Sequence, residues 1–294
     1  MQRQRDRSHT HPLSSAREAF WRAQLSDDLG VYHGAMSPPP TPWLIDESPA
    51  ALCNDTFPFG ILGITANGTR DVDVCLQNVA HLQANASVVR ERDNSLVGRR
   101  FRSCAVVGSS GRLLNQRLGD TISAHEAVWR FNIAPASPAE HVGNRTTVSV
   151  TTSMGISTAY QRHVMPAVYC GEPWWSGCLR FTARFHVPLI NPVLVRSLQA
   201  ALAEHPRKGS IPSAGLVGLA LARQLCSKVS VFGFSDPHHA EAAGTPAHYW
   251  NAKSHGNESD YFRAITKPRG PFHEWENQWR LIERWRRSEA IRVY

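Results

Sequence analysis

The sequence contains no long hydrophobic run. None of its stretches approaches the roughly 18 to 20 apolar residues that are needed to cross a bilayer, and no apolar segment of a signal peptide follows Met1. Like charges are not gathered into blocks either. The net charge is +8, and the one cluster, Arg284, Arg286 and Arg287, lies near the end of the chain. We attribute this cluster to the solvated face of a terminal helix and expect no nucleic-acid partner, whereas a negatively charged small substrate suits the positive excess.

The six cysteines lack the Cys-x-x-Cys spacing of zinc sites. They are accompanied by five Asn-x-Ser/Thr sequons, at Asn54, Asn67, Asn85, Asn144 and Asn257. Together the two features favour an oxidising, secretory compartment. Asn144 lies in a segment that we expect to be buried, so we predict that it carries no glycan.

The turn Gly108-Ser109-Ser110-Gly111 lacks the GxGxxG spacing of a dinucleotide site, and no acidic ribose contact follows it. A dehydrogenase is therefore disfavoured. The turn follows the apolar run 104–107, which suits a buried parallel strand. Backbone N–H groups at such a turn can hold a phosphate. Because every strand-to-helix turn of an α/β fold needs glycine, a purely structural role is equally compatible with this pattern.

The composition divides the chain in two. Residues 1–56 are polar and then rich in proline, which predicts a largely irregular stem or linker. Residues 57–294 form the expected catalytic domain, with strands at 104–107, 127–132, 146–152 and 229–234 and helices at 112–119, 191–205 and 213–226. The alternation predicts a single Rossmann-type α/β domain, with a mostly parallel central sheet flanked by helices. Ligand is expected outside the carboxyl ends of the strands.

Histidine is the usual general base near neutral pH. The chain has 14 histidines, however, and spacing alone does not favour His248 or His273 over His163 or His186.

Four ordered segments resemble a known family: CAVVGSSGRLLNQRLGDTISAHEAVWRFNIAP with HVGNRTT, then IPSAGLVGLALARQLCSKVSVFGF, HYWN and FHEWENQW. They are similar to the large, small, third and very small sialylmotifs of the animal-type sialyltransferases, and the resemblance covers residues 101–294. It implies a variant glycosyltransferase-A-like domain. Such a domain transfers sialic acid from CMP-sialic acid to a glycan hydroxyl, with inversion and without a metal.

Carried over motif by motif, the resemblance implies six donor-binding residues: Ser109, Ser110, Asn132, Ser213, Gly215 and Gly233. Ser109 and Asn132 correspond to contacts with phosphate and ribose, and the last three residues to the wall around the cytidine. His248 resembles the residue that steadies the departing phosphate. His273 resembles the catalytic base, which the acceptor hydroxyl requires.

The resemblance also implies the partners and the location. We expect a nucleotide-sugar donor, a glycan acceptor on a glycoprotein or glycolipid, and a type II membrane protein of the Golgi lumen whose N-terminal anchor is absent from this chain. No metal is expected, because the Asp-x-Asp match at 71–73 precedes the first motif. A disulfide between Cys104 and Cys226 is implied by the family. Pairing of Cys53 with Cys75 and of Cys170 with Cys178 rests on proximity alone.

Several positions depart from the family pattern. Gln278 stands where a glutamate is usual, Ala214 replaces a hydroxyl residue, and His141 replaces an aspartate, which removes a negative charge near the expected centre of the fold. These changes keep two alternatives open. One is a transferase for another CMP-keto-sugar such as CMP-Kdo, and the other is a catalytically silent homologue that binds CMP or glycans.

Overall fold

The computed structural model describes residues 99–151, 164–168, 211–237, 245–251 and 273–294, with isolated positions 96, 190, 195, 198, 199, 201, 202, 257, 258 and 260. The expected stem and the cysteine pairs 53–75 and 170–178 lie outside the described residues. Of the helix expected over 191–205, the five described positions are all helical. Within the described ranges, no helix has the length and apolar character of a membrane span.

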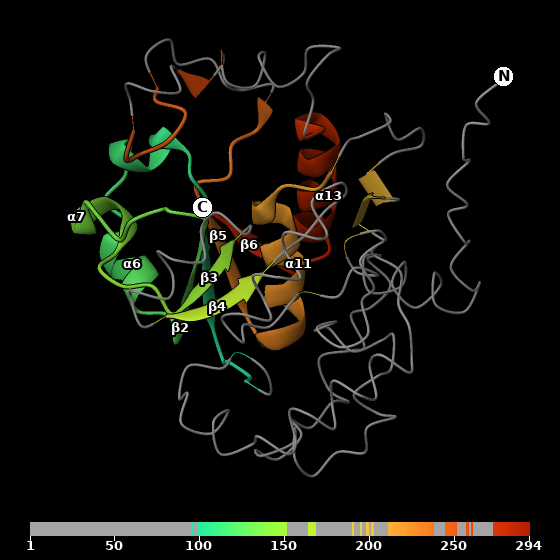
Figure 1. Cartoon of the computed structure of the whole chain (residues 1–294), viewed down its shortest axis with the longest axis horizontal. Coiled ribbons are helices and arrows are strands. Elements are labelled where there is room, and N and C mark those ends of the chain that lie inside the picture. Colours follow the sequence, from blue (N-terminus) through green and yellow to red (C-terminus); the bar gives the residue numbers. More distant parts are fainter. Residues whose placement is uncertain are drawn as a thin grey trace, which may run out of the picture.

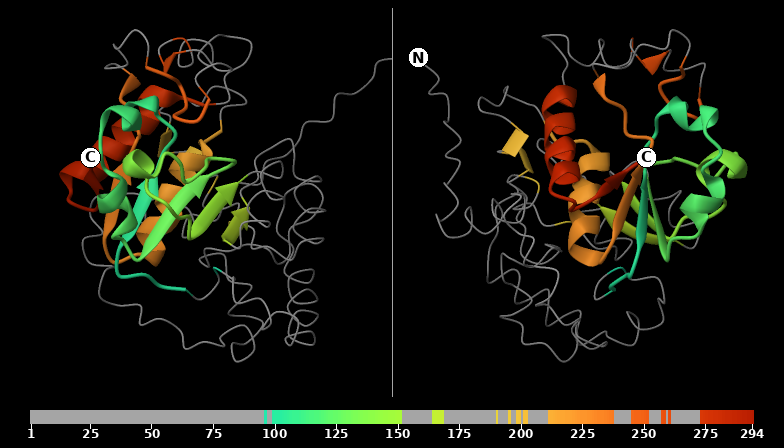
Figure 2. Two further views of the ribbon diagram at one scale, coloured as in Figure 1. Left: turned by 90° about the vertical axis from the view of Figure 1, so that its left-hand side faces the viewer. Right: turned by 180° about the vertical axis from the view of Figure 1, so that it is seen from behind.

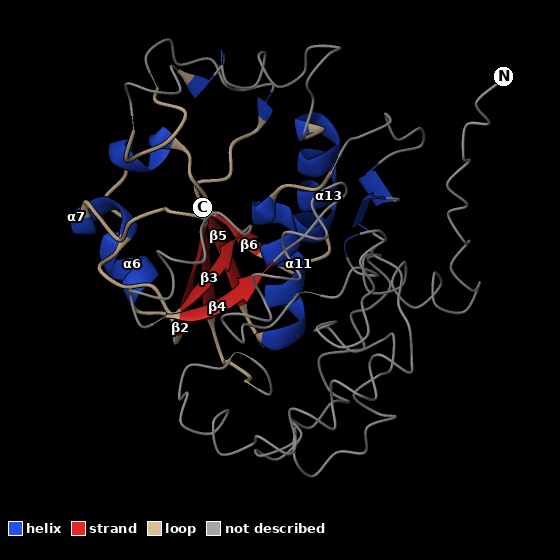
Figure 3. Ribbon diagram, viewed as in Figure 1, coloured by secondary structure: helices blue, strands red, loops and turns tan. Residues whose placement is uncertain are grey.

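A parallel sheet of six strands forms the centre of the domain (Figures 1 and 3), in the order β4-β3-β2-β1-β5-β6. The strands are β1 Cys104–Val107, β2 Ala127–Phe131, β3 Val148–Thr151, β4 Met165–Val168, β5 Val229–Phe232 and β6 Arg292–Val293. The four inner strands confirm the expected strands. The two edge strands, β4 and β6, were not predicted.

Helices cover both faces of the sheet (Figure 2). Alternate strand residues face opposite ways, so Cys104 and Val106 of β1 pack in one apolar cluster and Ala105 and Val107 in the other. The first cluster includes side chains of α11, Ala214–Leu225, and α13, Trp275–Arg287. The second cluster lies under three short helices: η2 Gly111–Asn115, α6 Gly119–Ser123 and α7 Ala139–Val142. The predicted α/β architecture is therefore confirmed.

The helix expected over 112–119 is divided in two. Helix η2 ends at Asn115, and Gly119 begins α6 instead of closing the first helix. A Cβ atom at Gly119 would lie 1.9 Å from the carbonyl oxygen of Ala139. Glycine is therefore required there by the close approach of α7, a tertiary cause that local sequence does not reveal.

Helix α13 has the solvated basic face that the sequence predicts. Leu281, Ile282 and Trp285 are buried against the sheet. The arginines of the terminal cluster are exposed, and the guanidinium of Arg223 from α11 lies 4.3 Å from the Trp285 ring centroid. The basic cluster is thus the outer face of a packed helix.

The disulfide implied by the resemblance is present. It joins Cys104, at the start of β1, to Cys226, immediately after α11, across a sequence separation of 122 residues. On the chain-entropy model a loop of this size stabilises the fold by about 5 kcal/mol. The bond fixes the amino end of β1 to the helix that leads into β5.

The strand order places a switch point beside β1. The chain builds β2, β3 and β4 on one side of β1 and then returns to pair β5 on the other side, with Val107 opposite Phe232. In doubly wound sheets, ligands bind at the carboxyl ends of the strands where the order reverses. The turns after β1 and β5 meet at this position.

Candidate functional site

A cavity of about 150 Å³ lies at the switch point. All eight residues assigned from the sequence line it: Ser109, Ser110, Asn132, Ser213, Gly215, Gly233, His248 and His273. They come from the ends of β1, β2 and β5, from the start of α11, from the segment 245–251, and from the residues just before α13. The structure thus brings together residues that are up to 164 positions apart in the sequence.

The glycine turns after β1 and β5 are packed directly on each other. The N–H of Gly108 donates to Phe232 at 2.7 Å, and the N–H of Ser110 donates to Gly233 at 3.2 Å. The N–H of Gly111 donates to Pro246 at 3.1 Å. These three amides are therefore engaged within the protein, and the backbone phosphate cradle considered from the sequence is not formed by them.

Ser110 belongs to a buried network beneath the turn. Its Oγ accepts the N–H of Arg112 at 3.1 Å and lies 2.8 Å from the hydroxyl of Ser235. Ser235 is also hydrogen-bonded to Glu258, whose carboxylate pairs with the Arg112 Nε at 3.0 Å. Glu258 and Ser235 line the cavity, and nothing in the sequence pattern singled them out.

Asn132 is held at the cavity by its backbone. It follows β2 in the left-handed region, with φ of 52°, a conformation that asparagine tolerates better than most residues. Its N–H donates to Val150 at 2.9 Å. The side chain is exposed at the cavity, which agrees with a ligand-facing position.

Arg130 of β2 holds together the segments around the carboxyl end of this strand. Its guanidinium is buried and donates to the carbonyls of Val142 and Arg145 and to the Tyr249 hydroxyl. Burial lowers the pKa of Arg130, and the Tyr249 hydroxyl partly opposes that shift. The residue links β2 to the segment that carries His248.

The segment 245–251 closes one side of the cavity. The N–H of Tyr249 donates to the Ser109 carbonyl at 3.0 Å, and the hydroxyl of Tyr249 donates to Pro135. The half-buried imidazole of His248 lies against Trp250, with ring centroids 4.8 Å apart. These contacts place His248 next to the turn after β1.

Ser213 and Gln278 join α11 to α13 at the other side of the cavity. The Ser213 hydroxyl caps α11 by accepting the Leu216 N–H at 3.1 Å. The same hydroxyl donates to Gln278 Oε1 at 2.6 Å, and the Ser213 N–H donates to that oxygen at 3.2 Å. Ser213 therefore holds the scaffold as well as lining the cavity.

His273 lies two residues before α13, next to Ile211 of the segment that leads into α11. Its Nδ1 is 2.9 Å from the Ile211 carbonyl oxygen, which can only accept. In the neutral ring the proton consequently lies on Nδ1, and Nε2 carries the lone pair. This is the tautomer that a general base requires.

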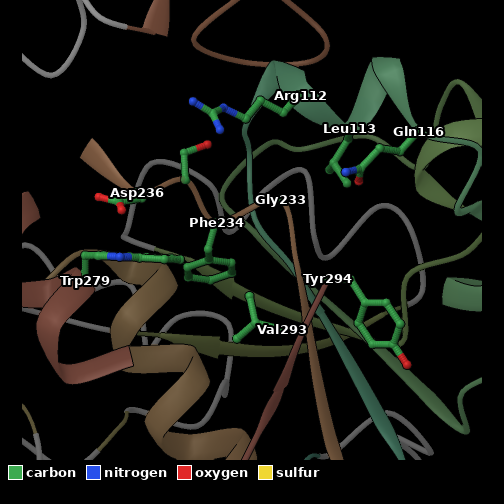
Figure 4. Close-up of a pocket in the computed structure, with 10 residues that line it drawn as sticks. Arg112, Leu113, Gln116, Gly233, Phe234, Asp236, Trp279, Val293 and Tyr294 are labelled. Carbon is green, nitrogen blue, oxygen red and sulfur yellow. The ribbon is translucent and has the colours of Figure 1, made fainter. Parts of the chain in front are cut away.

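A second hollow, of about 310 Å³, adjoins the first (Figure 4). The two share the turn Gly233–Ser235 and Trp279. Figure 4 shows Phe234 and Trp279 on one side of this hollow and Tyr294 on the other. Neither His248 nor His273 lines it, so the chemistry suggested by the two histidines belongs to the smaller cavity.

Two expectations from the sequence are wrong. His141 is not at the centre of the fold: it lies on α7 near the surface, with Nδ1 2.6 Å from the Gln116 carbonyl oxygen. Asn144 is exposed in the turn after α7, so burial does not protect its sequon from glycosylation. His141 lies on the short helix α7 and Asn144 just after it, and the sequence does not distinguish the outer side of this helix from a buried segment.

The fold and its switch-point cavity define an α/β protein of the glycosyltransferase-A-like class. The chain belongs to glycosyltransferase family 29, the sialyltransferase family, whose model matches residues 60–170 and 174–277. The fold is similar to that of a mammalian sialyltransferase solved in complex with Gal-β-1,3-GalNAc-ortho-nitrophenol. That match has a TM-score of 0.51 at 19% identity and covers 82% of this chain and 91% of the other.

Two curated relatives illustrate the range of the family. A β-1,6-galactosyltransferase of Arabidopsis thaliana is 31% identical over 184 residues, which is 49% of this chain and 46% of the relative. A lactosylceramide α-2,3-sialyltransferase of Homo sapiens is 26% identical over 188 residues, 52% of this chain and 44% of the relative. The chain thus spans less than half the length of either relative in these matches.

Proposed function

We propose that the protein transfers sialic acid from CMP-sialic acid to a hydroxyl, typically of a galactosyl residue, on a glycan acceptor. The proposal includes inversion, independence of metal and action in the Golgi lumen. One observation carries it: the eight residues assigned from the four motifs line one cavity at the switch point, in a chain of the sialyltransferase family.

The two histidines suit the two ends of the reaction. The acceptor oxygen attacks the anomeric carbon of the sialic acid while the bond from that carbon to the phosphate oxygen breaks, and CMP leaves with the electron pair. The acceptor proton passes to Nε2 of His273, whose Nδ1 proton is directed to Ile211. His248 supports the negative charge on the departing phosphate.

The Arabidopsis thaliana relative favours a second candidate. Because a protein 31% identical to this chain is a β-1,6-galactosyltransferase, a donor carrying galactose competes with CMP-sialic acid as the substrate. Transfer from CMP-Kdo, and binding of CMP or glycans without turnover, are further alternatives that Gln278 and Ala214 keep open.

Turnover with matched donors tests the proposal. The purified, disulfide-intact protein is given CMP-sialic acid, CMP-Kdo or UDP-galactose with a β-galactoside acceptor, with and without EDTA, and the products are identified by mass. We expect sialylated product from CMP-sialic acid, unaffected by EDTA and strongly reduced by Asn132→Ala. Product from one of the other two donors alone assigns that donor instead, and CMP binding without turnover assigns a silent binder.

A further inference from the structure

The sequon Asn144-Arg145-Thr146 lies in the turn between α7 and β3, and Asn144 is exposed there. The Ser123 hydroxyl donates to Asn144 Oδ1 at 3.3 Å and accepts the backbone N–H of the same residue at 3.3 Å. The amide oxygen is therefore engaged. The amide nitrogen, Nδ2, has no hydrogen-bond partner among the described residues, and it is the atom that carries the sugar in a glycosylated sequon.

Arg145, the middle residue of the sequon, holds the turn in place. Its guanidinium donates to three backbone carbonyls within residues 123–126 and to the Thr147 hydroxyl. None of these contacts involves the amide of Asn144 or the hydroxyl of Thr146. A sugar on Asn144 would consequently displace no hydrogen bond that fixes this turn.

The sequon lies at the amino ends of the strands. Thr146 is two positions before the start of β3, and Ser123, the partner of Asn144, is four positions before the start of β2. The candidate cavity lies at the carboxyl ends of the strands, and the five residues of β2 span roughly 16 Å. A glycan on Asn144 would therefore leave the cavity open.

Asn257, the other sequon residue that the structure describes, has different surroundings. Its Nδ2 donates to the Asp260 carboxylate at 2.7 Å, and its Oδ1 accepts the Asp260 N–H at 2.8 Å. It also pairs with Pro246, in the segment that carries His248 into the cavity wall. A sugar on this half-buried side chain would compete with Asp260 for the amide nitrogen.

We propose that Asn144 is an N-glycosylation site and that Asn257 is not. The proposal rests on the part of the proposed function that places the protein in the secretory lumen, where the glycosyl donor is a lipid-linked oligosaccharide diphosphate. A bond forms between Nδ2 of Asn144 and C1 of the first sugar. The bond from C1 to the diphosphate oxygen breaks, the lipid diphosphate leaves with the electron pair, and the amide gives one proton to a base of the glycosylating enzyme.

Site mapping on the full chain, directed into the secretory pathway of a eukaryotic cell by a cleavable signal sequence, tests the proposal. A glycosidase releases the N-glycans in isotopically labelled water, which converts each glycosylated asparagine into a labelled aspartate that peptide mass spectrometry detects. We expect the label at Asn144 and none at Asn257. Asn144→Gln and Thr146→Ala should each remove one glycan, and Thr146→Ala does so while keeping Asn144 and its contacts with Ser123.

Turnover of CMP-sialic acid by the same preparations separates this inference from the proposed function. Wild type and Thr146→Ala should turn over at the same rate, because the glycan is remote from the cavity. Turnover by a wild type whose Asn144 is bare would mean that the inference is wrong and the proposed function stands. A glycan on Asn144 in a folded protein without turnover would establish the modification site and overturn the transferase. Label at Asn257 equal to that at Asn144 would contradict the distinction drawn from their surroundings.

Discussion

At the scale of single residues, the two ring nitrogens of His273 can be tested separately. Nδ1 positions the imidazole through its hydrogen bond to Ile211, whereas Nε2 is the atom proposed to accept the proton. Asparagine has an N–H donor close to the position of Nδ1, so His273→Asn can keep the 2.9 Å contact with Ile211 while losing Nε2. We expect turnover to fall by about 10²–10⁴-fold, the usual contribution of a general base. CMP affinity, measured by titration, should stay within about twofold of wild type, because the contact that positions the residue is kept.

His141 offers the matched control for this substitution. Its Nδ1 is also bonded to a carbonyl, that of Gln116, but the residue does not line the cavity. His141→Asn should therefore leave turnover unchanged. A rate for His273→Asn close to that of His141→Asn would show that His273 is not the base.

At the scale of elements, the turn after β5 depends on glycine for two reasons. Gly233 has φ of +64°, and a Cβ atom there would lie 2.5 Å from Leu113 Cδ1. The left-handed conformation alone costs a non-glycine residue about 1–2 kcal/mol. Gly233→Ala should therefore lower the free energy of unfolding by about 2 kcal/mol or more, measured by urea denaturation.

Gly215 supplies the comparison for the same substitution. It lies in α11 with an ordinary φ, and its added Cβ would be 3.2 Å from the Phe234 ring. Alanine in a helix gains up to about 1 kcal/mol over glycine, which offsets this tight contact. Gly215→Ala should stay close to wild type in stability, and an equal loss in both variants would contradict the role given to the φ of Gly233.

The elements also show what local sequence predicts and what it does not. The inner strands are apolar runs bounded by turn residues, and all of them were predicted. The edge strands gave weaker signals: β4 contains Pro166, and β6 has only two residues. Proline is tolerated at a sheet edge, where one side of the strand needs no donor, so edge strands lack the pattern that identifies inner ones.

At the scale of the whole molecule, the candidate site was predictable only through its motifs. Spacing could not distinguish His248 or His273 from twelve other histidines, and the resemblance to the sialylmotifs supplied both. Glu258 was not predictable by either route. It lies next to Asn257, which pairs with Pro246 beside the third motif, and neither Asn257 nor Glu258 belongs to any of the four motifs.

The Arg112–Glu258 pair therefore tests whether a residue outside the four motifs helps to stabilise the site. The Glu258 side chain is 4% exposed and that of Arg112 35%, so the pair is weakly screened by solvent. Glu258→Gln keeps the shape and a hydrogen bond to Ser235 but removes the charge. We expect a loss of about 2 kcal/mol in the free energy of unfolding, below the full cost for a wholly buried pair.

A double-mutant cycle with Arg112→Gln isolates the pairwise contribution. Its coupling energy should be about 1 kcal/mol or more, because the two side chains are in direct contact. The Glu283–Arg286 pair of α13 has a similar separation of 2.9 Å but lies on the surface, so Glu283→Gln should change stability by less than about 0.5 kcal/mol. Coupling at Arg112–Glu258 no larger than this surface value would mean that Glu258 is held at the site by the backbone pairing of Pro246 with Asn257 rather than by the ion pair.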